Sequence, residues 1–120
     1  MGSNNYRNGS HWGPTSQFIR NPNVNDLDEL FTEIDSDIII YGHDHSPSYI
    51  EGNKVYINPG ALGCPGEDKN IARAGILNLN DNVTYQQLNL EYNVQDVIDK
   101  IEKINYPAKD IIKKMFYGVK

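Results

Sequence analysis

The chain has 120 residues, of which 38% are hydrophobic and 22% are charged, as in an ordinary globular domain. Its 11 basic and 16 acidic residues give a formal net charge of −5, which argues against nucleic-acid binding through a basic patch. No apolar run approaches the ~20 residues that cross a bilayer, and the polar first ten residues lack signal-peptide character. At 120 residues we expect a single domain. Its one cysteine, Cys64, cannot form an internal disulfide, so we expect the domain to be cytoplasmic.

The N-terminal part of the chain is rich in Asn, Gly and Ser and shows no sustained periodicity. This composition predicts an irregular segment over residues 1–24 and a folded domain over residues 25–120. A short helix capped by Asn25 is expected to open the domain, because apolar side chains then recur on one helical face. The residues of this face are Leu27, Leu30, Phe31 and Ile34.

A compact β-branched run over residues 37–41 predicts a strand. Its three consecutive isoleucines make both faces of the strand apolar, so we expect it to be covered on both sides. Residues 48–51 and 54–58 are separated by Gly52-Asn53, a pair that predicts a tight hairpin. The domain therefore begins as a helix followed by a buried sheet.

The C-terminal half predicts a second hairpin and then two helices. Residues 72–79 and 83–90 alternate around Asp81-Asn82, a pair that tolerates positive φ angles. Apolar positions at helical spacing follow, and the last helix is expected to begin near Pro107 and end near Gly118. We expect the terminal helices to pack on the sheet, with membrane contact through the Lys-rich tail as the alternative. This order predicts a mixed α/β fold.

Two histidines, His43 and His45, follow the isoleucine strand directly. In extended backbone, alternate side chains point the same way, so both imidazoles can face one locus. Gly42 would let the chain turn out of the sheet at a strand end, where α/β folds bind ligands. Neutral imidazole is the commonest metal ligand, and Asp44 adds negative potential. Because an isolated His-x-His pair is more often a solvated loop, the assignment of a metal site depends on its context.

That context is a linked set of motifs. The strand, the Gly42-His43-Asp44-His45 loop, the hairpin and the Asn58-Pro59-Gly60 corner follow one another within residues 25–92. Together they resemble the C-terminal signature of the calcineurin-like metallophosphoesterases of the bacterial phosphodiesterase type. The resemblance implies the second half of a four-layer α/β/β/α sandwich, in which a mixed sheet is flanked by helices.

The resemblance also implies a chemistry. The family is a hydrolase family that binds two divalent cations, with Mn²⁺ preferred over Fe or Zn, and these activate water against a phosphoester substrate. His43 would bind one cation and His45 the other, whereas His11 is either a further ligand or a histidine of a terminal loop. The resemblance assigns no catalytic residue to this chain. It places four residues at the substrate pocket: Gly42, Asp44, Asn58 and Gly60.

Other motifs of the family are missing from the sequence. Its Asp-x-His, Gly-Asp and Gly-Asn-His motifs, the last of which protonates the leaving group, do not occur here. Two or three imidazoles do not provide the bridging carboxylate that brings two metals together. We therefore expect the chain to form part of a metal-dependent phosphoesterase and to be inactive or impaired alone.

Two alternatives to the phosphoesterase remain open. The chain could be a non-catalytic module that forms a homo-oligomer or binds another chain through exposed sheet edges. It could also be a simple metal-binding or storage protein that uses His11, His43 and His45 alone. A third chemistry, nucleophilic catalysis by Cys64, requires a base in hydrogen-bond reach, and a packed loop thiol is the simpler interpretation.

Overall fold

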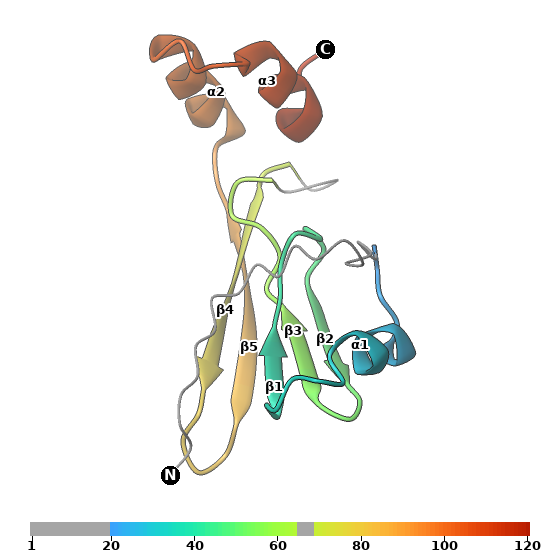
Figure 1. Ribbon diagram of the computed structural model, residues 1–120. Helices are drawn as coiled ribbons and strands as arrows, with labels where there is room; N and C mark the ends of the chain where they lie inside the picture. The colour runs from blue at the N-terminus through green and yellow to red at the C-terminus, as the bar shows by residue number, and fades with distance from the viewer. Residues whose placement is uncertain (1–19, 65–68) are drawn as a thin grey trace.

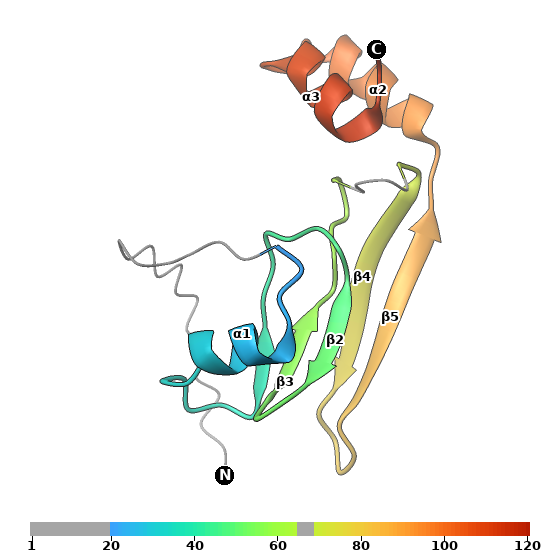
Figure 2. The ribbon, with the colours of Figure 1, turned by 90° about the vertical axis from the view of Figure 1, so that its right-hand side faces the viewer.

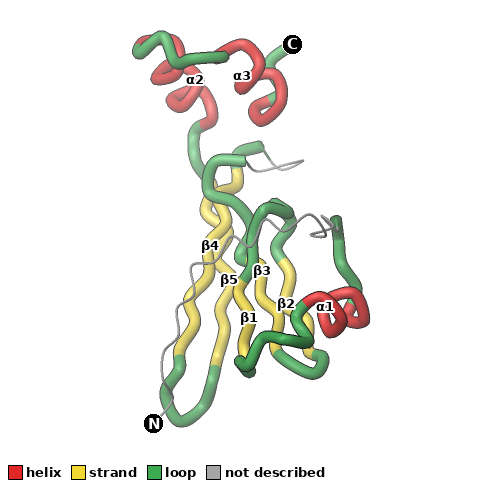
Figure 3. The backbone as a smooth tube through the Cα atoms, in the orientation of Figure 1, coloured by secondary structure: helices red, strands yellow, loops and turns green. Residues whose placement is uncertain are grey.

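The computed structural model describes residues 20–64 and 69–120, so His11 and most of the predicted irregular segment lie outside the described residues. The described residues form a small α/β domain of three helices, a mixed three-stranded sheet and a two-stranded hairpin (Figures 1 and 3). In chain order the elements are α1 (Val24–Leu30), β1 (Ile38–Ile40), β2 (Ser48–Glu51), β3 (Val55–Asn58), β4 (Ile71–Asn78), β5 (Thr84–Glu91), α2 (Val94–Lys103) and α3 (Lys109–Tyr117).

Helix α1 is capped by Asn23, so the prediction of Asn25 as the cap is wrong. The Asn23 side-chain oxygen accepts hydrogen bonds from the N–H groups of Asn25 at 2.9 Å and Asp26 at 3.1 Å. The Asp26 carboxylate in turn accepts from the Asn23 N–H at 2.9 Å, which completes a capping box. Asp28 accepts hydrogen bonds from the Asn53 N–H at 2.8 Å and the Tyr56 hydroxyl at 2.7 Å. It therefore ties α1 to the β2–β3 hairpin, and burial with this hydrogen bond raises the pKa of Tyr56 to about 12.

The apolar face of α1 is shorter than predicted. Leu27 is buried and Phe31 is partly buried against the same core, whereas Leu30 is 49% exposed. Ile34 lies beyond the end of the helix and is also exposed. The prediction of a four-residue face is therefore wrong for Leu30 and Ile34, because the helix ends before a second apolar turn can form.

The three-stranded sheet has the order β1-β3-β2. β1 pairs in parallel with β3, from Ile38 opposite Val55 to Ile40 opposite Ile57. β2 pairs antiparallel with β3 through the predicted Gly52-Asn53 turn, and β4 pairs antiparallel with β5. Both predicted hairpins are confirmed.

The domain has three layers (Figure 2). Helix α1 covers one face of the three-stranded sheet, where Leu27, Ile39 and Tyr56 form the core. The β4–β5 hairpin covers the other face, where the rings of Tyr49 and Tyr85 stack at 5.8 Å. The hairpin thus lies over β2 and β3 and leaves part of β1 uncovered.

Only one face of strand β1 is fully covered by other elements. Ile39 points toward α1 and is 8% exposed, but Ile40 on the opposite face is 59% exposed. The prediction that both faces of this strand are covered is therefore wrong. Among the described residues, the β4–β5 hairpin is the only element on the face of the sheet opposite α1. It lies over β2 and β3 and leaves Ile40 exposed.

The terminal helices form where predicted but do not pack on the sheet. Figures 1 and 2 show α2 and α3 packed against each other beyond the ends of β4 and β5. Asn93 caps α2 directly after β5, and Gly118 ends α3 with a φ of 66°. The expectation that these helices flank the sheet is wrong, because contacts within the helix pair hold them at the strand ends. No helix in the described part of the chain is long and apolar enough to cross a membrane.

Ion pairs join the two terminal helices and predict a response to acid. Hydrogen bonds from Lys109, at 2.6 Å, and from Lys113 lower the pKa of Glu102 to about 2. Because the folded pKa lies below the unfolded one, this stabilisation is present near neutral pH and disappears as the pH falls toward 2. We expect Glu102→Gln to lower the urea midpoint slightly at pH 7 and to match the wild type near pH 2, by far-ultraviolet circular dichroism. Glu33→Gln, a control in an exposed position, should have no effect at either pH, and an equal deficit of Glu102→Gln at both values would contradict the assignment.

Candidate metal centre

The histidine loop leaves the sheet at the carboxyl end of the parallel strand β1. The Tyr41 N–H donates to the Ile57 carbonyl at 2.9 Å, which is the last bond of β1 to β3. The Tyr41 and Ser48 hydroxyl groups lie 2.8 Å apart and join the two ends of the loop. Residues 42–47 therefore project from a fixed base at the edge where parallel strands place ligand-binding loops.

The turn in this loop is at His43 and not at Gly42, contrary to the prediction. His43 has a φ of 76°, a left-handed conformation that costs a non-glycine residue of order 1–3 kcal/mol. A Cβ atom added at Gly42 would meet open space, so packing does not require glycine there. Because β1 ends at Ile40, the alternation of an extended strand does not apply to His43 and His45. Both histidines are exposed.

Asp44 uses its carboxylate within the loop. One oxygen accepts a hydrogen bond from the Asn21 N–H at 2.9 Å, and the other accepts from the Ser46 N–H at 3.3 Å. Asp44 thus ties the histidine loop to the segment before α1. A shallow hollow of about 160 Å³ lies beside it. The hollow is lined by Asn21, Pro22, Asp44, Ser46, Pro47 and Ser48.

Asn58 joins the histidine loop to the Asn-Pro-Gly corner. Its side chain is 1% exposed, its Nδ2 donates to the Asp44 carbonyl at 2.6 Å, and its Oδ1 accepts from the Gly60 N–H at 2.9 Å. A buried polar side chain with two such bonds fixes both segments. Asn58 was predicted to lie at the substrate pocket. In the structure its buried side chain acts on the site by holding the backbone of Asp44 and Gly60.

Gly60 packs directly under the histidine loop. Its φ of 84° favours glycine, and a Cβ atom there would lie 2.9 Å from the Arg73 Cβ and 3.3 Å from the His45 carbonyl. The half-buried Arg73 therefore lies beside the site. In the sequence it is a long cation between two small residues of β4, Ala72 and Ala74, and it falls within the stretch that carries the family resemblance.

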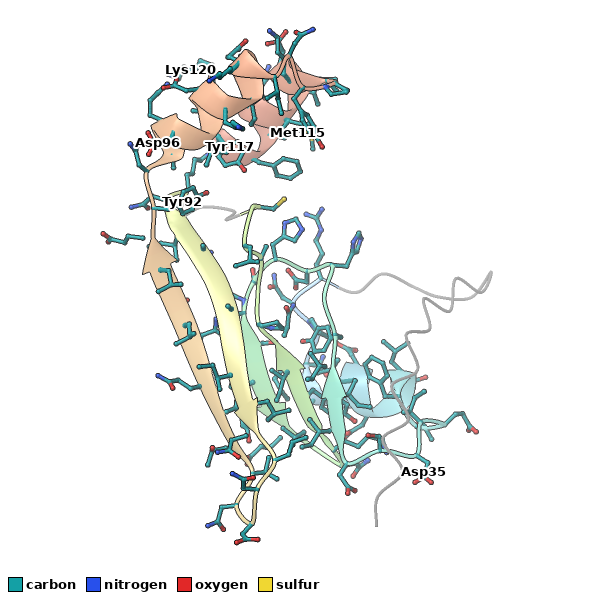
Figure 4. All side chains as sticks on the ribbon, turned by 90° about the vertical axis from the view of Figure 1, so that its left-hand side faces the viewer. Asp35, Tyr92, Asp96, Met115, Tyr117 and Lys120 are labelled. Carbon is teal, nitrogen blue, oxygen red and sulfur yellow. The ribbon has the colours of Figure 1, made fainter. Side chains whose placement is uncertain are left out.

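Helix α3 closes one side of the loop. The ring of Phe116 lies 6.4 Å from the His45 ring, with an angle of 56° between the planes. The Tyr117 hydroxyl donates to the Gly63 carbonyl at 2.9 Å, and Figure 4 shows Tyr117 on α3 above the loops at the strand ends. These contacts cannot be read from the sequence, because an apolar helical face does not indicate which element it meets.

Cys64 lies in the same loop as Gly63 and is partly buried. Burial raises the pKa of its thiol, as it raises the pKa of the neighbouring Tyr92 and Tyr117 hydroxyl groups. A nucleophilic cysteine requires the opposite shift, because the thiolate is the reactive form. The environment of Cys64 therefore agrees with a packed loop thiol.

The described residues do not make a complete metal site. Across residues 20–64 and 69–120, no three side chains of His, Cys, Asp or Glu are grouped so that they could hold a cation. His43 and His45 supply two nitrogen donors, and the Asp44 carboxylate is engaged with backbone N–H groups. Two donors do not satisfy one divalent cation, which takes four or more ligands, and they do not satisfy a pair.

Comparisons with known proteins show the fold of the chain. No protein-family model matches it, and no curated protein matches it. Among solved structures it is similar to the hypothetical protein PH1004 from Pyrococcus horikoshii OT3, with a TM-score of 0.65 and 14% identity. The similar region covers 88% of this chain and 42% of that protein, so the chain spans less than half the length of its structural relative. At this identity the likeness shows a shared small α/β fold.

Proposed function

We propose that the chain contributes the histidine loop of a metal-dependent phosphoesterase and forms the second half of its four-layer α/β/β/α sandwich. The observation that carries the proposal is the bond from the Asn58 side chain to the Asp44 carbonyl. Two motifs that resemble one family lie 13 residues or more apart in sequence, and this bond supports their acting as one site. In this proposal Mn²⁺, Fe or Zn is the cation, and the substrate is a phosphoester.

The layers of the domain support the same proposal. The observed order of helix, sheet and hairpin corresponds to three of the four proposed layers. Arg73 on β4 lies beside Gly60, under the histidine loop. The chain alone is proposed to lack hydrolytic activity, because its described residues provide two metal donors.

Metal titration tests the role of the histidine loop. His43→Gly is preferred to His43→Ala, because glycine accepts the left-handed backbone at this position and removes only the imidazole. We expect His43→Gly and His45→Ala each to weaken Zn²⁺ and Mn²⁺ binding about tenfold or more in isothermal titration calorimetry, which corresponds to about 1.4 kcal/mol. His11→Ala in the same titration measures the contribution of the third histidine.

The controls separate the loop from nonspecific binding. Gln86→Ala changes an exposed side chain on β5 and should leave the titration unchanged. Unchanged affinity in both loop variants would remove the proposed site. A loss in the His11→Ala variant equal to that in the two loop variants would show that His11 is a third ligand.

A non-catalytic interaction module is the second candidate function. It is favoured by the small core, since in the described part of the chain only Leu27, Ile39, Tyr56, Ile57 and Ile101 are buried apolar residues. Such a core supplies little of the stability that a domain of this size needs, so contact with another surface is expected. Sedimentation velocity distinguishes this candidate: a dimer without affinity for Mn²⁺ would support it against the phosphoesterase.

A further inference from the structure

The two terminal helices form one body, the terminal arm (Val94–Tyr117). Glu102 on α2 accepts hydrogen bonds from Lys109, at 2.6 Å, and from Lys113, both on α3. Ile101 on α2 is also buried, and it does not belong to the core cluster beneath α1. Among the described elements, each of these helices contacts the other more extensively than it contacts any strand. The arm therefore has contacts of its own that are separate from those of the sheet.

A very short connection joins the arm to the sheet. Tyr92 follows β5 and is fixed at both ends, because its N–H donates to the Asn70 carbonyl at 2.9 Å and its hydroxyl donates to the Lys69 carbonyl at 2.9 Å. Helix α2 begins at Val94, so Asn93 is the one residue between this anchor and the arm (Figure 2). Domain hinges consist of a few residues at the ends of elements that absorb a change of backbone angles. Asn93 has the position of such a hinge.

The far end of the arm returns to the loops at the strand ends. The Phe116 ring lies 6.4 Å from the ring of His45 in the histidine loop. The Tyr117 hydroxyl donates to the Gly63 carbonyl at 2.9 Å, in the segment after the Asn-Pro-Gly corner. Both contacts come from the last turn of α3, at the opposite end of the arm from its hinge.

Lys69 makes a third contact with the same end of the arm. Its side chain packs on Gly118 so closely that a Cβ atom added there would overlap it. A cation at this place also suits the carboxyl end of a helix, where the backbone dipoles leave a partial negative charge. Because the Lys69 carbonyl holds the Tyr92 hydroxyl, one residue contacts both the hinge and the docked end.

Docking of the arm acts directly on a predicted metal ligand. His45 is exposed, and its loop already contains the left-handed backbone of His43. A ring that packs on the imidazole restricts its rotation before any ligand arrives. Immobilising a side chain on binding costs about 0.5–1.5 kcal/mol, and a side chain that is already held avoids much of this cost.

We propose that the terminal arm regulates the histidine loop. The arm rotates about Asn93, and its docked state orders the His45 imidazole and so raises the affinity of the loop for a divalent cation. This inference rests on the proposed function, because the regulated ligand is the cation of that site. The movement itself does not depend on the metal.

Residual dipolar couplings of the ¹⁵N-labelled full chain test the movement without any metal. In the wild type, the couplings of the arm and of the β4–β5 hairpin should fit one alignment tensor. We expect the double variant Phe116→Ala/Tyr117→Phe to require a separate tensor for each, because two of the docking contacts are lost. Unchanged couplings within the hairpin would show that the variant is folded. The matched control is Met115→Ala/Tyr106→Phe, which alters side chains that are 67% and 46% exposed and should keep one tensor.

Zn²⁺ calorimetry on the same variants tests the regulation. We expect the double variant Phe116→Ala/Tyr117→Phe to bind Zn²⁺ about threefold to tenfold more weakly than the wild type, since His45 is no longer held before binding. The control Met115→Ala/Tyr106→Phe should bind as the wild type does. Increased affinity in the first variant would contradict the proposal, because it would mean that the docked arm opposes binding.

The outcomes separate the arm from the proposed function. Separate tensors in the wild type, or one tensor in the variant Phe116→Ala/Tyr117→Phe, would overturn the docking of the arm. A released arm with unchanged Zn²⁺ affinity would overturn the regulation, while a loss of affinity in His43→Gly would leave the proposed function intact. Insensitivity of Zn²⁺ binding to both His43→Gly and His45→Ala would overturn the proposed function, and the couplings would still decide whether the arm moves.

Discussion

Replacing Leu27 with Ala is expected to lower the free energy of unfolding by about 2–5 kcal/mol, the usual cost of truncating a buried leucine. Leu27 is 1% exposed and packs with Ile39 and Tyr56 in the core between α1 and the sheet. Because this cluster is small, the cavity removes a large share of the contacts that hold the helix. Urea denaturation followed by far-ultraviolet circular dichroism measures the change.

Leu30→Ala is the matched control for this prediction. It makes the same chemical change on the same helix, but Leu30 is 49% exposed, so we expect a loss below about 1 kcal/mol. If Leu27→Ala prevents folding altogether, Leu27→Val provides a milder truncation with a measurable transition. Equal losses for the Leu27→Ala and Leu30→Ala variants would show that α1 does not bury its apolar face as described.

Asn58→Ala is expected to lower the free energy of unfolding by roughly 2–4 kcal/mol. The substitution leaves the Asp44 carbonyl and the Gly60 N–H, both part-buried, without their side-chain partner. Each backbone group left without a hydrogen bond lowers the free energy of unfolding by about 1–3 kcal/mol. The histidine loop also loses its anchor to the Asn-Pro-Gly corner. We therefore expect weaker Zn²⁺ binding together with the loss of stability, measured by calorimetry and urea denaturation.

Two further variants make the result specific. Asn58→Asp keeps the size of the side chain but replaces the donor to the Asp44 carbonyl with an acceptor, so its loss should equal or exceed that of Asn58→Ala. Asn89→Ala, at an exposed position on β5, should change neither stability nor metal binding. Retention of full stability by Asn58→Asp would argue against the role of the Nδ2 donor.

Much of the fold could be predicted because its signals are local. The Gly52-Asn53 and Asp81-Asn82 turns fix the registers of the two hairpins, and Gly118 ends α3 in the left-handed conformation expected for a C-terminal glycine. The cap of α1 was misplaced by two residues. Asn23 and Asn25 have equal intrinsic tendency to cap, and only the reciprocal bond that the Asp26 carboxylate accepts from the Asn23 N–H decides between them.

The features that could not be predicted depend on contacts distant in sequence. The exposure of Ile40 and the position of α3 beside His45 follow from how the layers stack, which periodicity does not encode. The proximity of the histidine loop to the Asn58 corner was expected from the family resemblance. The bond that joins them was not, nor was the left-handed backbone at His43, because a loop's hydrogen bonds determine its dihedral angles.

The contact of Phe116 with His45 makes the C-terminal tail part of any event at the loop. A ligand of His45 that binds more tightly when α3 is docked would stabilise the docked helix, and docking of the helix would raise the affinity for that ligand by the same factor. The Tyr117 bond to Gly63 extends this linkage to the segment after the Asn-Pro-Gly corner. Resistance of the last ten residues to proteolytic trimming would thus report on cation occupancy from the far end of the chain.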